Sequence, residues 1–160
     1  FSGQALLVRT GLMVRVPFSA AELNVHVGYA TQSFAIAPLA TDGVTLRPNL
    51  PSVTFNGVRA GLGTRVAFNS TFGFEATAGF TSVMRLGEIA SAAFFPKATA
   101  LAFDGAAGLT LKLTDGLEAR VMADYTHYLL SLNPQSGGAF SATGATDQYL
   151  GITAALGWSL

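Results

Sequence analysis

Apolar and polar residues alternate along most of this chain with a period of two. The clearest run is residues 117–129, where the odd positions are mostly apolar and the even positions include Glu118, Arg120 and Asp124. Successive side chains of a β-strand point to opposite faces, so this pattern is typical of a strand with one apolar and one polar face. The alternation therefore predicts an all-β fold.

Seven segments share the alternation and predict seven strands. They are residues 4–16, 23–29, 58–68, 72–80, 103–113, 117–129 and 150–160, and Arg85 continues the phase of the fourth. We expect short turns at 17–20, 69–71 and 115–116, where Asp-Gly favours a type I′ hairpin, and long loops at about 38–52, 88–98 and 133–146. Because short and long connections alternate, the chain is expected to form an antiparallel up-and-down sheet. A single domain would span residues 1–160, with all the short turns at one end.

The charged residues of these strands all fall on the polar face. Seven are basic and five are acidic. They are Arg9, Arg15, Arg59, Arg65, Arg85, Lys112 and Arg120, with Glu22, Glu75, Asp104, Glu118 and Asp124. If the sheet closes into a barrel with its polar face inside, these side chains fill the interior.

The composition limits the classes of function that the chain fits. It has 160 residues, a formal net charge of 0, no Cys and only 11% charged residues, against about 25% in a typical soluble domain. Without Cys there is no disulfide scaffold or thiolate metal site, and a neutral chain lacks the basic face of a nucleic-acid-binding protein. No zinc motif, phosphate-binding glycine loop or nucleophile elbow is present. We expect neither a metal nor a cofactor.

Three features favour a membrane-spanning barrel with its polar face inside. Glycines are frequent on the polar face, as a crowded small interior requires, and charge is scarce for a surface that faces water. Side chains of the apolar face form two belts near the strand ends, roughly 20–25 Å apart, as in interfacial girdles. The girdle residues are Phe18, Tyr29, Phe68, Phe72, Phe80, Phe103, Tyr125, His127 and Trp158. Alternation alone also allows a soluble calycin-like barrel, in which the apolar face lines a ligand cavity.

The last segment, residues 149–160, carries a resemblance to a known class. Its sequence YLGITAALGWSL resembles the C-terminal assembly signal of small bacterial outer-membrane β-barrel proteins, the class that contains the OmpA membrane domain, OmpX and OmpW. That signal usually ends in an aromatic residue, whereas this segment ends in Leu160, with Trp158 two positions before it. The resemblance implies an outer-membrane location in a Gram-negative cell envelope, with short turns toward the periplasm and long loops outside.

The number of strands gives a further expectation. Bacterial single-chain barrels have an even number of strands, and an open strand edge in hydrocarbon is too unfavourable to persist. The pattern yields seven strands, so we expect eight in the complete barrel. At least one more strand would precede Phe1 or come from another chain across the open N-terminal edge.

Two interpretations of the interior charges remain open. In the first they form a plug of salt bridges, and the protein is a structural or interaction component that anchors or adheres through its external loops. In the second they line a narrow pore for small polar solutes, with a preference for anions because basic residues outnumber acidic ones. In both cases the expected partners are membrane lipid, including lipopolysaccharide, and a protein bound at the loops or at the open edge.

Two smaller features carry alternatives of their own. His127 lies on the lipid face near the outer girdle, where some outer-membrane lipid-modifying enzymes have a His and a Ser. Here position 129 is Leu and Ser131 is one outward position further, so hydrogen bonding to lipid headgroups is favoured over catalysis.

Phe94 and Phe95 fall in an external loop, where they either pack over the barrel mouth or form a docking patch.

Overall fold

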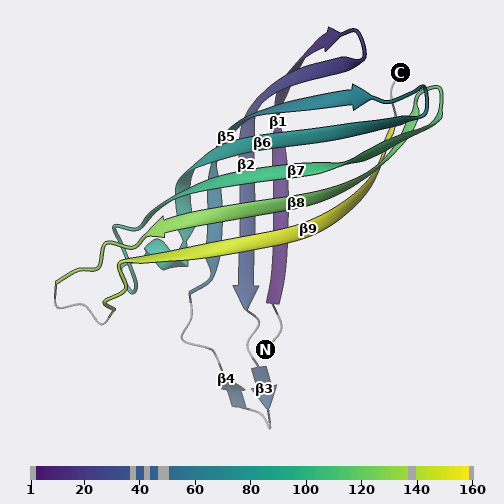
Figure 1. Ribbon diagram of the computed structural model, residues 1–160. Coiled ribbons are helices and arrows are strands. Elements are labelled where there is room, and N and C mark those ends of the chain that lie inside the picture. Colours follow the sequence, from purple (N-terminus) through teal and green to yellow (C-terminus); the bar gives the residue numbers. More distant parts are fainter. Residues whose placement is uncertain (1–2, 37–38, 42–43, 47–50, 137–139, 159–160) are drawn as a thin grey trace.

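The computed structural model describes residues 3–36, 39–41, 44–46, 51–136 and 140–158, and its main element is one antiparallel sheet of seven strands (Figure 1). The strands are β1 (Gly3–Phe18), β2 (Ala21–Ile36), β5 (Val53–Ala67), β6 (Phe72–Gly87), β7 (Thr99–Thr114), β8 (Leu117–Ser131) and β9 (Gly144–Trp158). A separate small sheet pairs β3 (Leu39–Thr41) with β4 (Val44–Leu46), and a 3₁₀ helix, η1, covers Glu88–Ala90. The predicted all-β class and the seven strands are confirmed. No helix in the described part of the chain is long and apolar enough to cross a membrane.

The strands follow one another in the sheet in chain order, β1-β2-β5-β6-β7-β8-β9, so the predicted up-and-down arrangement is confirmed. Each of the six pairings is antiparallel. The edge strands β1 and β9 therefore run in the same direction, from the long-loop end to the short-turn end (Figure 1). They are not paired with each other, so the sheet is open. The closed barrel and its eighth strand stay predictions.

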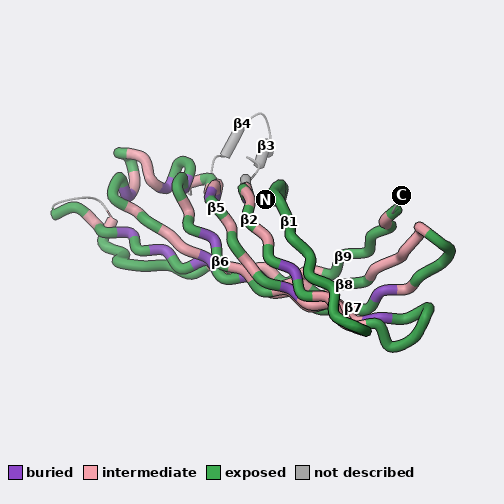
Figure 2. Tube along the Cα trace, turned by 90° about the horizontal axis from the view of Figure 1, so that it is seen from above, coloured by how far each residue is buried: buried purple, intermediate pink, exposed green. Residues whose placement is uncertain are grey.

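The sheet curls into a trough rather than lying flat (Figure 2). The hydroxyl of Tyr128 on β8 donates a hydrogen bond of 2.9 Å to Oε1 of Gln32 on β2. These two strands are four positions apart in the sheet, which in a flat sheet would separate them by roughly 19 Å. Side chains on this face thus meet across the hollow of the trough, and this face is the concave one.

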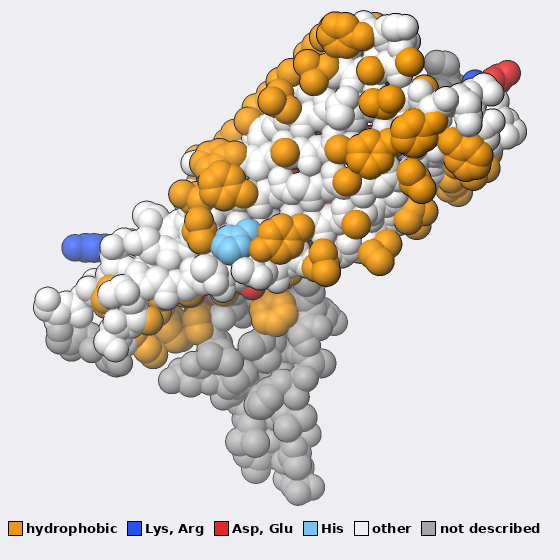
Figure 3. Space-filling model, viewed as in Figure 1, with side chains coloured by type: hydrophobic (Ala, Val, Ile, Leu, Met, Phe, Trp, Pro, Cys, Tyr) orange, Lys and Arg blue, Asp and Glu red, His pale blue; other side chains and the backbone are white. Residues whose placement is uncertain are grey.

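The convex face carries the apolar positions of the alternation and is exposed (Figure 3). Leu12, Leu150 and Ile152 are 78, 83 and 82% exposed, although each is a large aliphatic side chain. The aromatic residues predicted to form girdles are also on this face and exposed. They are Phe18, Tyr29, Phe68, Phe72, Phe80, Phe103, Tyr125 and Trp158. The arrangement is the reverse of that in a soluble calycin-like barrel, which buries its apolar face.

A compact apolar cluster fills the long-loop end of the trough. Its buried members are Phe55, Leu86, Ile89, Phe95, Ala102, Tyr128, Leu130 and Leu132. The rings of Phe55 and Tyr128 stack with their centroids 3.7 Å apart. Since Phe55 and Tyr128 belong to β5 and β8, the cluster joins strands that are three positions apart in the sheet.

The predicted docking patch at Phe94 and Phe95 is wrong, because both side chains pack inward. Phe95 is buried in the apolar cluster, and its N–H donates a 3.0 Å hydrogen bond to the carbonyl oxygen of Ile89. Phe94 is partly buried, and its ring centroid lies 5.4 Å from that of Phe140. The two rings help to cover the end of the trough, which was the other interpretation of this loop.

The turn between β7 and β8 forms where Asp115-Gly116 predicted it, but it is not type I′. That type needs a positive φ at both central residues. Gly116 has φ 94°, whereas Asn133 is the single residue other than glycine with a positive φ in the described ranges. The register also shifts between Lys112 and Thr114, so an irregularity in β7 accompanies the turn. A turn with one left-handed residue, supplied by glycine, therefore closes this hairpin.

Candidate functional site

The concave face holds two networks of charged side chains. Each network joins side chains from strands that are not neighbours in the sheet. In the first network Asp104 on β7 is the central acid, with a side chain only 4% exposed. Nε of Arg59 on β5 donates to both of its carboxylate oxygens, at 2.9 and 3.1 Å. Nη2 of Arg9 on β1 lies 3.6 Å from Asp104 Oδ1 and donates a 3.4 Å hydrogen bond to Oγ1 of Thr126. This network spans the trough from β1 to β8.

The second network lies nearer the short-turn end. Glu118 on β8 accepts from Arg65 on β5, and its Oε1 accepts from Nε of Arg120 at 2.7 Å. Nη1 of Arg120 is 3.4 Å from Oε2 of Glu75 on β6. A separate pair joins Arg15 and Glu22 at 3.6 Å, on β1 and β2. These contacts are salt bridges between side chains of the polar face.

Glycines let the long side chains lie flat on the sheet. Arg59 crosses Gly79 of β6 to reach Asp104 on β7, and a Cβ at Gly79 would be 2.5 Å from Arg59 Nη2. The imidazole of His26, which accepts a hydrogen bond from Arg59, lies over Gly61 in the same way. The polar-face glycines therefore position the ion pairs as well as saving space.

Asp124 lies on the concave face but takes no part in either network. Its Oδ2 is buried and has no hydrogen-bond partner among the residues that the structure describes. It rests against Gly151 of β9, where a Cβ would be 2.4 Å from that oxygen.

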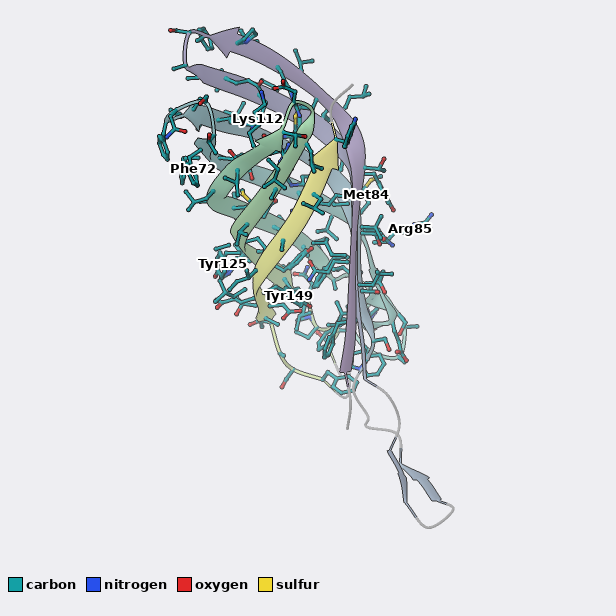
Figure 4. The ribbon with its side chains drawn as sticks, turned by 90° about the vertical axis from the view of Figure 1, so that its right-hand side faces the viewer. Phe72, Met84, Arg85, Lys112, Tyr125 and Tyr149 are labelled. Atoms are coloured by element: carbon teal, nitrogen blue, oxygen red, sulfur yellow. The ribbon has the colours of Figure 1, made fainter. Side chains whose placement is uncertain are left out.

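Arg85 is not among the interior charges, and that part of the prediction is wrong. The register of β5 and β6 shifts so that Gly57 pairs with Val83 whereas Asn56 pairs with Arg85. The extra residue, Met84, forms a bulge in β6 and reverses the phase after it. Arg85 is exposed on the convex side, and Leu86 takes the buried position (Figure 4).

Lys112 also stands apart from the networks, at the rim of the trough. Its Nζ lies 2.8 Å from Oδ1 of Asp115 in the exposed β7–β8 turn. The hydrogen bond from Lys112, aided by its positive charge, holds the pKa of the Asp115 carboxyl below its usual range.

The charges left on the concave face balance. With Arg85 removed, six basic residues share the phase of this face, because Lys112 pairs in register with Glu118. Six acidic residues share it too, because Asp147, which pairs in register with Tyr128, adds to the five predicted. They are Arg9, Arg15, Arg59, Arg65, Lys112 and Arg120, with Glu22, Glu75, Asp104, Glu118, Asp124 and Asp147. The basic excess that would favour anions is therefore absent from this face.

No family model, curated protein or solved structure matches the chain. Its chemistry must therefore be judged from its own residues. No group of three or more His, Asp or Glu side chains within the described segments is arranged to hold a metal ion.

His127 lies on the convex face of β8, between aromatic neighbours. Its Nδ1 is 3.0 Å from the Tyr125 hydroxyl and 3.2 Å from Nε2 of Gln148 on β9. The amide nitrogen of Gln148 is a donor, so Nδ1 of His127 is the acceptor in that contact. The hydroxyl of Ser131 instead hydrogen-bonds Asn133 at 3.4 Å. Among the described residues, Tyr125 and Gln148 hold the ring of His127 by hydrogen bonds, and the Ser131 hydroxyl is not directed to it.

The apolar cluster at the long-loop end is the interior feature that sequence reasoning missed. A signal for it exists at the end of β8, where Tyr128, Leu130 and the following Leu132 continue the phase of the charged residues Glu118 to Asp124. The concave face thus changes from charged to apolar along one strand. In the sequence, this change is visible where apolar residues occupy both the odd and the even positions of a segment.

Proposed function

We propose that the chain is an integral outer-membrane protein of the β-barrel type, and that it acts as a structural or interaction component through its long loops. The proposal rests on one observation, the exposed apolar convex face that extends over all seven strands, while every charged residue of these strands except Arg85 lies on the concave face. Contiguous exposed apolar surface on this scale marks a membrane or partner surface.

The dimensions of the strands suit this proposal. A transmembrane β-strand needs about 9–11 residues, and the seven strands have 15 or 16. Each strand can therefore cross the hydrocarbon layer and extend beyond it on at least one side. In this arrangement the short turns face the periplasm and the long loops face outward.

The filled interior favours a structural role over a pore. Ion pairs between strands that are not neighbours cross the trough, and the apolar cluster occupies its long-loop end. An eight-stranded barrel has an interior that side chains just fill. The lipid-modifying alternative receives little support from His127, whose Nδ1 is in hydrogen-bond contact with Tyr125 and Gln148 and not with Ser131.

The test uses Trp158, the single tryptophan. The folded chain is placed in vesicles, and its fluorescence is quenched by brominated lipid and, separately, by aqueous iodide. We expect strong quenching by lipid and weak quenching by iodide, since Trp158 is 68% exposed on the convex face.

Two variants that lack Trp158 provide the matched comparison. Tyr125→Trp in a Trp158→Phe background reports on the convex face, and Tyr149→Trp in the same background reports on the concave face. Brominated lipid should quench the first much more than the second. Equal quenching of both, or a chain that stays in solution without lipid, would overturn the proposed function.

A further inference from the structure

The bulge at Met84 places a cation on the convex face at the long-loop end of the sheet. Thr31, Asn56 and Arg85 are paired in register across β2, β5 and β6, so all three share one face. The Thr31 hydroxyl donates to Oδ1 of Asn56, which fixes the amide beside the guanidinium. The outward face, apolar nearer the middle of these strands, is polar at this level.

Arg85 has no ion pair or hydrogen bond with any residue that the structure describes. It borders a pocket of about 560 Å³ formed where the ends of β5 and β6 meet the loop around η1. Thr54, Asn56 and Thr99 contribute polar groups to this pocket, and Met84 contributes an apolar wall. A guanidinium with five donors therefore faces a space lined by further hydrogen-bonding groups.

The position of Arg85 along its strand indicates what meets this pocket. Phe80 pairs with Phe103 in the outer aromatic belt, and their ring centroids are 5.4 Å apart. Arg85 is five residues further toward the long loops, which corresponds to roughly 13 Å for a strand tilted by about 40°. If the aromatic belt marks the membrane interface, the backbone of Arg85 stands just outside it, and its long side chain can reach back to the lipid headgroups.

We propose that Arg85 and the adjacent pocket bind the phosphate of an anionic lipid headgroup. This proposal rests on the proposed function, because it requires the convex face to be in lipid. A guanidinium matches a phosphate with two parallel N–H···O hydrogen bonds, and Asn56 and Thr99 offer further donors beside it. The acyl chains would lie along Met84 and the apolar positions below it, of which Met84 is 69% exposed.

The test measures lipid selectivity of the full chain in phosphatidylcholine vesicles. Spin-labelled phosphatidylglycerol and spin-labelled phosphatidylcholine are compared by the fraction that is immobilised on the protein. We expect phosphatidylglycerol to be preferred about fivefold, as one basic residue near an anionic surface provides. Arg85→Gln should abolish the preference, and Arg85→Lys should reduce it because it loses the paired donors.

Lys112→Gln is the matched control, since it removes one positive charge from a side chain that pairs with Asp115 at the opposite end. It should leave the preference unchanged. Loss of the preference in both Gln variants, or no preference in the parent chain, would overturn the site. Displacement of the labelled lipid by inorganic phosphate alone would show a site for the free anion and would also overturn it.

The two proposals fail in different ways. If the chain enters vesicles and Trp158 is quenched by brominated lipid, yet no lipid is preferred, only the Arg85 site is wrong. If the chain does not enter vesicles, the proposed function itself is wrong.

Discussion

At the scale of single residues, Asp104 is the charge that depends most on its partners. Its side chain is almost fully buried, and Arg59 and Arg9 both approach it. Burying a carboxylate without a partner is strongly unfavourable, so the stability of this region depends on the pairing rather than on the carboxylate alone.

We predict that Asp104→Asn lowers the free energy of unfolding by about 3–5 kcal/mol, the usual effect of removing one partner from a buried pair. The variant leaves Arg59 with a neutral amide in a space from which water is largely excluded. Urea unfolding of the chain in micelles measures the change. Asp115→Asn, which breaks the exposed pair with Lys112, is the control and should leave the unfolding curve unchanged.

A second residue-scale prediction concerns the glycine under Arg59. Gly79→Ala should destabilise the fold by about 1–3 kcal/mol, as overpacking does, because the new methyl group displaces the guanidinium from Asp104. In an Arg59→Ala background the same substitution should have a much smaller effect, and a double-mutant cycle measures the difference. Additive effects would contradict this mechanism. Gly105→Ala is the control, since its Cβ would meet only the Thr77 carbonyl oxygen at 3.6 Å.

At the scale of elements, the bulge in β6 decides the direction of three consecutive side chains. Met84 and Arg85 are exposed, whereas Leu86 is only 4% exposed. Regular alternation would put Arg85 inside and leave Leu86 outside. The bulge therefore exchanges a buried charge for a buried leucine and completes the apolar cluster.

Because the chain has no Cys, single cysteines give a direct test of this bulge. Nitroxide labels on Met84→Cys and Arg85→Cys should be mobile, and a label on Leu86→Cys should be immobile. An alternating result, with position 85 immobile and positions 84 and 86 mobile, would show a regular strand and contradict the bulge. Electron paramagnetic resonance spectra of the folded chain make the measurement.

The sequence predicted the strands well because their alternation continues through most of each strand. Leu117 to Leu129, for example, keeps one phase throughout β8, and the phase alone places Glu118 and Arg120 on the concave face. The prediction put Arg85 on the wrong face of the sheet because a one-residue bulge depends on how two strands pair. The sequence of β6 alone does not show that pairing. Phe95 was left undecided because a loop residue becomes buried only when distant strands bring Phe55 and Leu132 beside it.

At the scale of the whole molecule, the concave face is electrically balanced and is closed at its long-loop end by apolar side chains. Ion pairs link β1 with β7 and β5 with β8, so they cross the space that a channel would need. The convex face is mostly apolar over the middle of the sheet. These features support the proposal that the molecule holds its interior fixed and presents its convex face to a nonpolar medium.

We predict that the chain, inserted in a planar lipid bilayer, shows no stepwise conductance above that of the bilayer. We expect no conductance because ion pairs cross the trough and the apolar cluster occupies its long-loop end. Stable steps of current would contradict the filled interior and restore the pore interpretation. Even then the balanced charges predict equal passage of chloride and potassium, which a salt gradient across the bilayer measures.

The strand order has a consequence for how the molecule forms and how long it lasts. Every strand pairs with a neighbour in sequence, whereas Arg59 and Asp104 are 45 residues apart and Arg9 and Thr126 are 117 residues apart. Short-range hairpins are reached early in folding, and contacts between distant residues close later. Asp104→Asn should therefore accelerate unfolding and leave the folding rate unchanged, with a φ-value near zero. The ion pairs across the trough would then determine the lifetime of the folded molecule, and the hairpins the speed of its formation.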